Sequence, residues 1–433
     1  MPLIPARPID IPRLLTPPRM TWQVPGSKSI TNRALVLAAL ADGESTLTGV
    51  LESDDTRHMR VALEALGIEI RSVDATTWTV RGGRSRLRAP ASPLFIGNSG
   101  TSVRFLTALA TLVPGAVTLV GDAAMAHRPI ADLVDGLRQL GVQVECESGC
   151  PPLTVHGGTL RGGVTRMRGD RSSQYFSALL LAGALAESPI TVETEGRLVS
   201  RPYVEITRRM VEAFGGRIDA DESSFEVRPV ATYRARAYAI EPDASSASYP
   251  FAIAAATRGV ITVLGLGTSA LQGDYAFTDV LAQLGADVSA TAGGTRIAGR
   301  DIVGIDVDMH DISDTVMTLA AIAPLASGPT HIRNIANIRI KETDRLAAIA
   351  IELKKLGQGV TEGPDSIVIE PRPIVPALVH CYGDHRMAMS FTVLGLAAGG
   401  VRIEDPACVA KTYPGFWDDV RACCASAGQP VDW

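Results

Sequence analysis

The chain is built from six consecutive repeats of about 72 residues. Each repeat contains an amphipathic segment that ends in a Leu-Gly-like turn and continues into a short strand, as in EALGIEI, RQLGVQVE and AQLGADVS. The turn glycines are spaced 74, 74, 70, 72 and 71 residues apart, at Gly67, Gly141, Gly215, Gly285, Gly357 and Gly428. Glycine is the residue that a helix C-terminus needs when it turns into the left-handed region. Six copies of one supersecondary motif therefore account for the whole chain.

A second helical segment recurs with the same period. It starts with polar residues and continues as an alanine- and leucine-rich body that is apolar on all sides, which predicts a helix buried in a domain interior. The six segments are GSKSITNRALVLAALA, GNSGTSVRFLTALATLV, RSSQYFSALLLAGALA, ASSASYPFAIAAATRG, ISDTVMTLAAIAPLA and GDHRMAMSFTVLGLAAG. Short strands such as ITVETE and VITVLG would form the sheets that cover these helices. Each repeat predicts a strand, a buried helix, a strand, a surface helix, and one or two further strands. The pattern therefore indicates an α/β protein of two similar domains, each closed by three repeats around three buried helices.

Composition limits the classes of function. With 46% apolar and 20% charged residues and a net charge of −5, the chain fits a globular protein without an electrostatic preference for nucleic acid or acidic membranes. No apolar run reaches the roughly 18 residues that span a bilayer, and the proline-rich N-terminus with Asp10 lacks the apolar core of a secretory signal. We therefore expect a cytoplasmic protein. The six cysteines follow no ligand spacing, which favours buried or idle thiols over metal or disulfide roles.

The polar heads of the buried helices are candidate anion sites. Unpaired backbone amides and the positive end of the helix dipole favour anions at each N-terminus. Serine, threonine, asparagine and aspartate there could act only as N-caps. Capping does not explain why the heads also carry Lys28, Arg33, Arg104 and Arg386. If the heads of both domains converge on one cleft, they form a receptor for a strongly anionic small molecule.

Seven motifs along the chain resemble those of one enzyme family. PGSKSxxNRA, GNSGTxxR, RSSQ, DASSASY, KETDRL, DHRMAM and AKTxP occur in this order. Together they resemble the 5-enolpyruvylshikimate-3-phosphate synthase family, and the resemblance runs from about residue 20 to 420. It implies an inside-out α/β barrel fold, in which each of two similar domains has three βαβαββ repeats around buried helices. It also implies an active site in the interdomain cleft. The implied domains are 27–241 and 1–26 plus 242–433, with a hinge near 24–28 and 239–243.

The resemblance also implies an activity. Family members transfer the enolpyruvyl group of phosphoenolpyruvate to the 5-hydroxyl of shikimate 3-phosphate and release phosphate, in the shikimate pathway to chorismate and aromatic amino acids. They are 3-phosphoshikimate 1-carboxyvinyltransferases and the target of glyphosate. The resemblance implies no cofactor, no metal and no nucleic-acid or membrane partner. It leads us to expect a monomer whose partners are its two small-molecule substrates.

The site residues are carried over from the family position by position. The set implied for shikimate 3-phosphate is Lys28, Ser29, Arg33, Ser172, Ser173, Gln174, Ser200, Tyr203, Asp314, Asn337 and Lys341. The set implied for phosphoenolpyruvate is Lys28, Asn98, Gly100, Arg128, Gln174, Glu342, Arg345, His385, Arg386 and Lys411. The implied catalytic residues are Lys28, Asp314, Glu342 and His385. Glu342 and Lys28 are the candidate acids and Asp314 the candidate base, and the division of these roles stays open.

Other interpretations compete with this one. Asp314 and His385 could be helix caps, and Glu342 with Arg345 could be an i, i+3 surface pair. The related transferase that acts on UDP-N-acetylglucosamine usually has a loop cysteine before its Arg-Pro, where this chain has AAMAH at 123–127. A non-catalytic anion-binding protein would not need intact Lys28 and Lys411. RNA-end chemistry on a similar repeat fold would need an aromatic platform or a basic face, and neither is visible.

Overall fold

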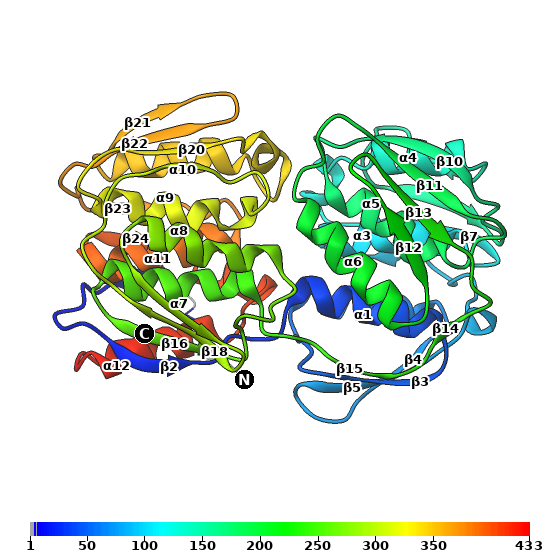
Figure 1. The fold of residues 1–433 in the computed structure, drawn as a ribbon, viewed down its shortest axis with the longest axis horizontal. Coiled ribbons are helices and arrows are strands. Elements are labelled where there is room, and N and C mark those ends of the chain that lie inside the picture. The colour runs from blue at the N-terminus through cyan, green and yellow to red at the C-terminus, as the bar shows by residue number, and fades with distance from the viewer. Residues whose placement is uncertain (1–3, 6) are drawn as a thin grey trace. The chain divides into compact units, whose positions relative to one another are not determined.

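The computed structural model describes residues 4–5 and 7–433 and divides the chain into two compact units. Gly26–Ile240 form what we call the first unit. Glu241–Trp433 and the N-terminal segment up to Pro25 form the second unit. Figure 1 shows that each unit has helices at its centre and strands around them. The implied hinge between the two units stays a prediction.

The first unit contains two kinds of helix. The buried helices are α1 (Lys28–Leu40), α3 (Gly100–Ala110) and α5 (Ser173–Gly183), and the outer helices are α2 (Asp54–Ala65), α4 (Ala131–Gln139) and α6 (Arg201–Ala213). Every residue of α3 is buried, and α1 is buried from Ile30 to its end. This confirms that helix bodies that are apolar on all sides lie in a domain interior.

The strands of the first unit form sheets with a repeated topology. They are β3 (Ala41–Thr48), β4 (Glu69–Ser72), β5 (Thr77–Gly82), β6 (Leu94–Phe95), β7 (Gly115–Val120), β8 (Gln143–Glu145), β9 (Leu153–Gly157), β10 (Gly163–Arg168), β11 (Ile190–Glu195), β12 (Arg217–Ala220), β13 (Ser224–Arg228), β14 (Tyr233–Arg234) and β15 (Ala237–Ala239). The strand orders are β14-β3-β5-β4, with β15 also on β3, then β6-β7-β9-β8 and β10-β11-β13-β12. In each order the first pair is parallel and the next two are antiparallel.

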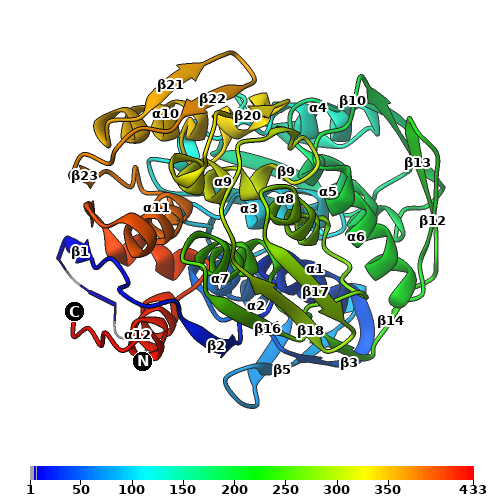
Figure 2. The same cartoon turned by 60° about the vertical axis from the view of Figure 1, so that its left-hand side comes forward.

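The second unit repeats this plan. Its buried helices are α7 (Ala244–Ala256), α9 (Val316–Ile322) and α11 (His385–Ala398), which lie side by side in Figure 2, and its outer helices are α8 (Phe277–Gln283), α10 (Arg345–Lys355) and α12 (Phe416–Ser426). Its strands are β1 (Ile9–Ile11), β2 (Arg19–Trp22), β16 (Val260–Leu264), β17 (Asp287–Thr291), β18 (Gly294–Ala298), β19 (Asp306–Asp308), β20 (Thr330–Arg333), β21 (Gly359–Glu362), β22 (Ile367–Glu370), β23 (Ala377–Val379) and β24 (Val401–Ile403). Two sheets, β2-β16-β18-β17 and β19-β20-β22-β21, have the topology of the first unit.

The sixth repeat departs from the predicted pattern. We expected a strand after Gly428, but residues 429–433 form none. Strand β1 pairs antiparallel with β24 instead, and β24 lies parallel to β23. The N-terminal strand β1 therefore takes the antiparallel position beside β24 in this sheet.

The six turn glycines have the backbone conformation that the repeat predicts. Their φ angles are 101°, 80°, 91°, 108°, 85° and 73° at Gly67, Gly141, Gly215, Gly285, Gly357 and Gly428. Side chains with a Cβ rarely adopt such angles. The repeat glycines therefore end one helix in each repeat, as expected.

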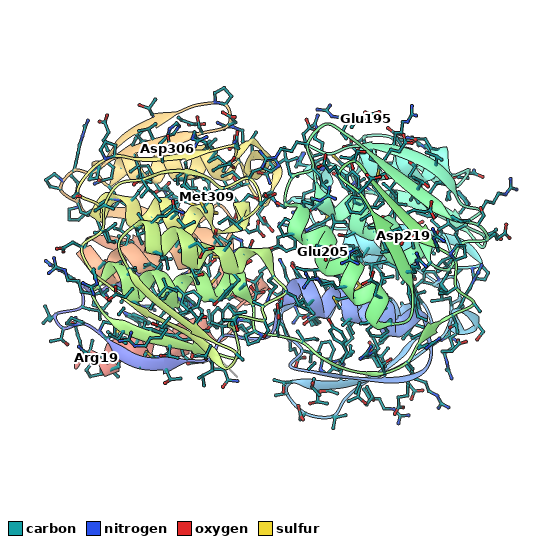
Figure 3. The ribbon with its side chains drawn as sticks, in the orientation of Figure 1. Arg19, Glu195, Glu205, Asp219, Asp306 and Met309 are labelled. Atoms are coloured by element: carbon teal, nitrogen blue, oxygen red, sulfur yellow. The ribbon has the colours of Figure 1, made fainter. Side chains whose placement is uncertain are left out.

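Many exposed arginines are neutralised by neighbouring acids. Three of these acids, Glu205, Asp219 and Asp306, are labelled in Figure 3. Glu205 pairs with arginines 208 and 209, Asp219 with 217 and 228, and Asp306 with 333. These acids neutralise the arginine side chains beside them on the surface. Among the described residues, no helix is long and apolar enough to be a membrane span.

One carboxyl group of the second unit predicts a pH-dependent stability. Asp419 on α12 accepts a 2.6 Å hydrogen bond from the Tyr413 hydroxyl, which accepts one of 2.8 Å from the Trp22 indole N–H. Burial raises the pKa of Asp419 to about 6, although the Tyr413 hydrogen bond opposes the rise. The native protein therefore holds this proton up to a higher pH than the unfolded chain, in which aspartate has a pKa of about 3.9. The contribution of Asp419 to the free energy of unfolding should fall as pH rises through this window.

We expect Asp419→Asn to remove this pH dependence, because the amide stays neutral and can still accept from Tyr413. The free energy of unfolding of the variant, compared with that of the parent, should be about 1–2 kcal/mol higher at pH 7.5 than at pH 4, after allowance for solvent screening. Urea unfolding at the two pH values measures the difference. A gain that is equal at both would show that Asp419 titrates normally.

Candidate functional site

The head of α1 places Lys28 beside an acid from α2. The Lys28 ammonium lies 3.3 Å from Oδ2 of Asp55, and both side chains are largely buried. Ser27 caps α1 by accepting from the Ile30 amide, so the helix starts at Lys28. Ser29, the next residue, is half-buried. The structure thus pairs a candidate catalytic lysine with an aspartate that the family motifs did not single out.

Arg33 lies deeper in the first unit than its predicted role suggests. It is 1% exposed, and its guanidinium donates to the Thr207 and Ser177 hydroxyls and to the carbonyls of Ser29 and Tyr203. Burial lowers the pKa of Arg33 to about 10. In this state Arg33 joins α1 to α5 and α6, so its contact with substrate stays a prediction.

The head of α3 brings three predicted phosphoenolpyruvate residues together. Arg128 Nη1 donates to the carbonyl of Asn98 at 3.1 Å and to its side-chain oxygen at 3.2 Å. The Arg128 guanidinium also lies against Gly100, where an added Cβ would be 2.6 Å from Nη2. The lack of a side chain at Gly100 therefore makes room for an arginine of the same site.

The head of α5 meets the head of α3. Gln174 accepts a 2.6 Å hydrogen bond from Arg104 and donates to the Thr101 hydroxyl at 3.3 Å. Ser172 is the N-cap of α5, and Ser173 is its first residue. The remaining candidates of this unit, Ser200 and Tyr203, lie at the start of α6, where Ser200 has a φ of 48°. Two of the buried helices in the first unit thus contact each other through their polar heads.

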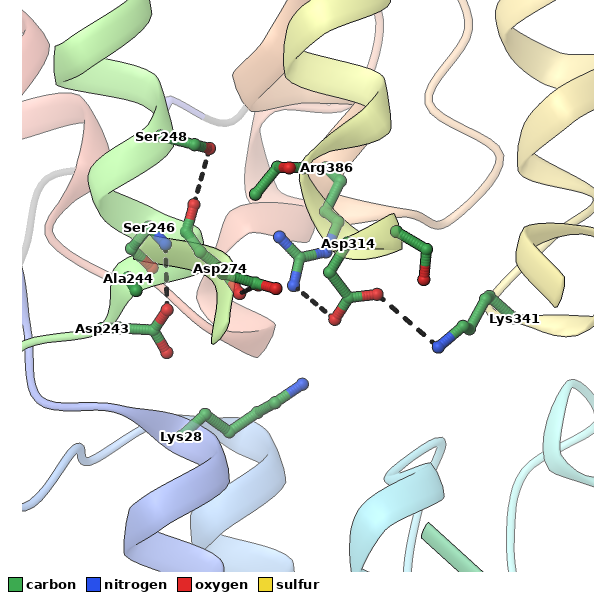
Figure 4. A network of polar contacts seen from close by, with 12 residues as sticks. Lys28, Asp243, Ala244, Ser246, Ser248, Asp274, Asp314, Lys341 and Arg386 are labelled. Atoms are coloured by element: carbon green, nitrogen blue, oxygen red, sulfur yellow. Dashed lines mark hydrogen bonds and ion pairs between the residues drawn. The ribbon is translucent and has the colours of Figure 1, made fainter. Parts of the chain in front are cut away.

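In the second unit three cations surround one carboxylate. Asp314, in the short helix η4 (Ser313–Thr315), lies 2.9 Å from Arg386 Nη2, 3.3 Å from Arg345 Nη1 and 3.6 Å from Lys341 Nζ. Figure 4 shows its carboxylate between Arg386 and Lys341. Burial raises the pKa of Asp314, but Arg386, Lys341 and Arg345 outweigh it and hold the pKa far below its usual range.

Arg345 links this carboxylate to two others. It is 2% exposed, and its donors reach Glu342 at 2.6 Å and Asp384 at 2.7 Å. Burial lowers the pKa of Arg345, but Asp384, Glu342 and Asp314 outweigh it and raise the pKa. Glu342 and Arg345 therefore form a buried pair within a network, rather than the surface pair that spacing alone allowed.

The other candidates of this unit surround the network. Asn337, in η6 (Ala336–Ile340), donates to the Ser313 hydroxyl at 2.9 Å, next to Asp314. His385 is buried at the start of α11, with Nδ1 3.6 Å from Asp384. The half-buried Lys411 ends η7 (Pro406–Lys411). No group of three or more His, Cys, Asp or Glu side chains in the described part of the chain could hold a metal ion.

Three residues that hold this machinery in place lie outside the predicted substrate and catalytic sets. Asp55 pairs with Lys28, Arg104 orients Gln174, and Asp384 clamps Arg345. Asp55 and Asp384 lie beside helix starts, where an aspartate ordinarily indicates a cap. Asp384 belongs to the DHRMAM motif, and the only signal for Asp55 is that it lies in a stretch dense in charge, LESDDTRH.

Comparison with known proteins gives one consistent result. The family model described as EPSP synthase (3-phosphoshikimate 1-carboxyvinyltransferase) matches residues 19–420. A 3-phosphoshikimate 1-carboxyvinyltransferase of Nostoc sp. (strain PCC 7120) is 44% identical over 414 residues, 94% of this chain and 97% of the relative. One of Shewanella piezotolerans is 45% identical over 410 residues, 93% and 96% of the two chains.

Solved structures agree with the sequence relatives. An EPSP synthase of Acinetobacter baumannii superimposes with a TM-score of 0.82 at 27% identity and covers 99% of both chains. The full-length structural match confirms the predicted α/β fold of two similar parts. The chain with these two clusters of charged helix heads belongs to the EPSP synthase (3-phosphoshikimate 1-carboxyvinyltransferase) family.

Proposed function

We propose that the helix heads of the two units act together on one pair of substrates. The family's reaction transfers the enolpyruvyl group of phosphoenolpyruvate to the 5-hydroxyl of shikimate 3-phosphate and releases phosphate. In this proposal Ser172, Ser173, Ser200 and Lys341 hold the 3-phosphate, and Asp314 faces the ring hydroxyls. Arg128, Arg345 and Arg386 pair with the carboxylate and phosphate of phosphoenolpyruvate, since guanidinium groups bind such anions bidentately.

The chemistry needs an acid, a base and several cations. The hydroxyl adds to C2 of phosphoenolpyruvate while C3 gains a proton, and the tetrahedral intermediate then loses phosphate. Glu342 and Lys28 are the proposed acids for C3, and Asp314 is the proposed base for the hydroxyl. Arginine and lysine side chains stabilise the negative charge on phosphate, so the proposal needs no metal or organic cofactor.

The three cations around Asp314 carry this proposal. While Arg386, Lys341 and Arg345 all face it, Asp314 is a poor proton acceptor. Anionic substrates that bind the same cations would reduce their effect on Asp314 and raise its pKa. Asp314 would then become an effective base only when phosphoenolpyruvate and shikimate 3-phosphate are both bound. The reaction would therefore not start with one substrate alone.

Phosphate release tests the function. We expect it to require both phosphoenolpyruvate and shikimate 3-phosphate and to survive EDTA, in a cytoplasmic enzyme that works as a monomer. Turnover with UDP-N-acetylglucosamine in place of shikimate 3-phosphate would overturn the substrate assignment. Loss of activity with EDTA would overturn the metal-free mechanism.

Glyphosate should compete with phosphoenolpyruvate, because its phosphonate and carboxylate resemble the phosphate and carboxylate of that substrate. Gly100→Ala should weaken this inhibition. The new methyl would overlap the Arg128 guanidinium and displace it. Displacement of Arg128 should raise the Michaelis constant for phosphoenolpyruvate, and the longer inhibitor should lose more. Inhibition kinetics against phosphoenolpyruvate measure both constants. An equal rise in both would mean that the variant acts through Arg128 alone, without a selective clash.

A further inference from the structure

A fully buried carboxylate in the second unit has no part in the mechanism above. Glu352, on α10, has 0% exposure. Its Oε1 accepts from the Tyr382 hydroxyl at 2.5 Å, and its Oε2 accepts from the His380 amide at 3.2 Å. Lys355 Nζ lies 2.7 and 3.0 Å from the two oxygens. A buried charge is tolerated only when it is paired and hydrogen-bonded, so these contacts are the condition for its presence.

The contacts of Glu352 fix an unusual backbone conformation. Tyr382 has a φ of 55°, in the left-handed region that a residue with a side chain enters at a cost of about 1 kcal/mol or more. Glu404 holds the preceding residues from another side, with contacts of 2.8 Å to His380 Nδ1 and 3.3 Å to the Cys381 amide. Two carboxylates thus hold the loop of residues 380–382, which leads into α11.

This loop determines where the head of α11 lies. The Asp384 amide donates to the Cys381 carbonyl at 2.8 Å, and the Asp384 carboxylate caps α11 through the Arg386 amide at 2.9 Å. Asp384 also receives the 2.7 Å contact from Arg345. Arg345 and Glu352 both belong to α10, so this helix holds the start of α11 at two points, through Asp384 and through the loop. The Arg386 side chain then reaches Asp314 at 2.9 Å.

We infer that Glu352 is a positioning residue for the phosphoenolpyruvate subsite, which it serves by holding residues 380–382 so that Arg386 and Asp384 face Asp314 and Arg345. The inference rests on the proposed role of Arg386 in that subsite. The contacts of the Glu352 carboxylate are with Lys355, His380 and Tyr382, which lie outside the predicted substrate sets. Its effect should therefore appear as a loss of phosphoenolpyruvate binding, not as the loss of an acid or base.

Steady-state kinetics of Glu352→Gln, Tyr382→Phe and the double variant test this inference. In Glu352→Gln a side-chain NH2 group would replace one carboxylate oxygen. This group would face the Lys355 ammonium or the His380 amide N–H, which are both donors, so a hydrogen bond would be lost. We expect its Michaelis constant for phosphoenolpyruvate to rise about tenfold or more, since small displacements at a site have large kinetic effects. The constant for shikimate 3-phosphate should change less than about threefold, because Asp314, which contacts Arg386, is also held by Lys341 and Arg345. Tyr382→Phe should act in the same direction, and the double variant should be less affected than the product of the two single effects.

Two controls separate the possible failures. Glu370→Gln is the matched substitution on an exposed carboxylate of β22 in the same unit and should leave all constants unchanged. Arg386→Ala tests the proposed function on which the inference rests. A raised constant for phosphoenolpyruvate in Arg386→Ala but not in Glu352→Gln would overturn the inference alone. No effect in Arg386→Ala would overturn the proposed subsite.

A purely structural role for Glu352 gives a different outcome. Thermal unfolding would then show a lower midpoint for Glu352→Gln, while the enzyme that is folded would keep unchanged Michaelis constants. That result would overturn the inference. Tyr382→Phe removes only a hydroxyl at a half-exposed side chain, so it keeps the test valid if Glu352→Gln does not fold.

Discussion

Lys28→Ala should reduce turnover at least about a hundredfold, the scale of a lost acid–base group. The substitution also leaves Asp55, which is 3% exposed, without the cation 3.3 Å away. Removal of an ion-pair partner from a buried carboxylate costs stability, so we expect a lower unfolding midpoint as well. Phosphate-release assays on folded enzyme, with thermal unfolding in parallel, measure the two effects separately.

Two further variants distinguish chemistry from folding at this position. Lys28→Arg keeps the positive charge beside Asp55 and should recover the unfolding midpoint without recovering turnover, because a planar guanidinium cannot replace a compact ammonium. Lys354→Ala, on an exposed face of α10, should change neither quantity. Near-normal turnover in Lys28→Ala would remove Lys28 from the catalytic set.

Asp314→Asn should also cost at least about a hundredfold in turnover, because an amide cannot take the proton of the attacking hydroxyl. The variant keeps the shape of the side chain but removes the charge that Arg386, Lys341 and Arg345 surround. It should fold, since Arg345 keeps its contacts with Glu342 and Asp384.

The pH dependence of the parent enzyme gives a second test of Asp314. In the free enzyme the three cations hold the pKa of Asp314 far below its usual range. Because kcat/KM reports the free enzyme and kcat reports the substrate complex, the acid limb of kcat should lie at higher pH than that of kcat/KM. The limb that belongs to Asp314 should be absent in Asp314→Asn. Coincident limbs in the parent would contradict the idea that bound anions restore the base.

The sequence alone determined the repeat architecture and the ends of its helices. The glycine after each surface helix and the apolar circumference of each buried helix are local properties, so the spacing of Gly67, Gly141 and their equivalents is enough to predict six units. The same local patterning failed after Gly428. There the final strand was replaced by β1, because a sheet edge pairs with whichever chain segment reaches it.

Only the tertiary structure decided how the charged residues are partnered. Asp55 with Lys28 and Asp384 with Arg345 join residues 27 and 39 positions apart, and no periodicity of the sequence relates such positions. The same holds for Arg33, whose motif suggests a ligand contact while its neighbours in space are Thr207 and Ser177. The pKa of an ionisable group depends on burial and on charges within a few ångströms, whatever their distance along the chain. The sequence therefore identified the polar heads. The packing of the helices decided that Lys28 pairs with Asp55 and that three cations surround Asp314.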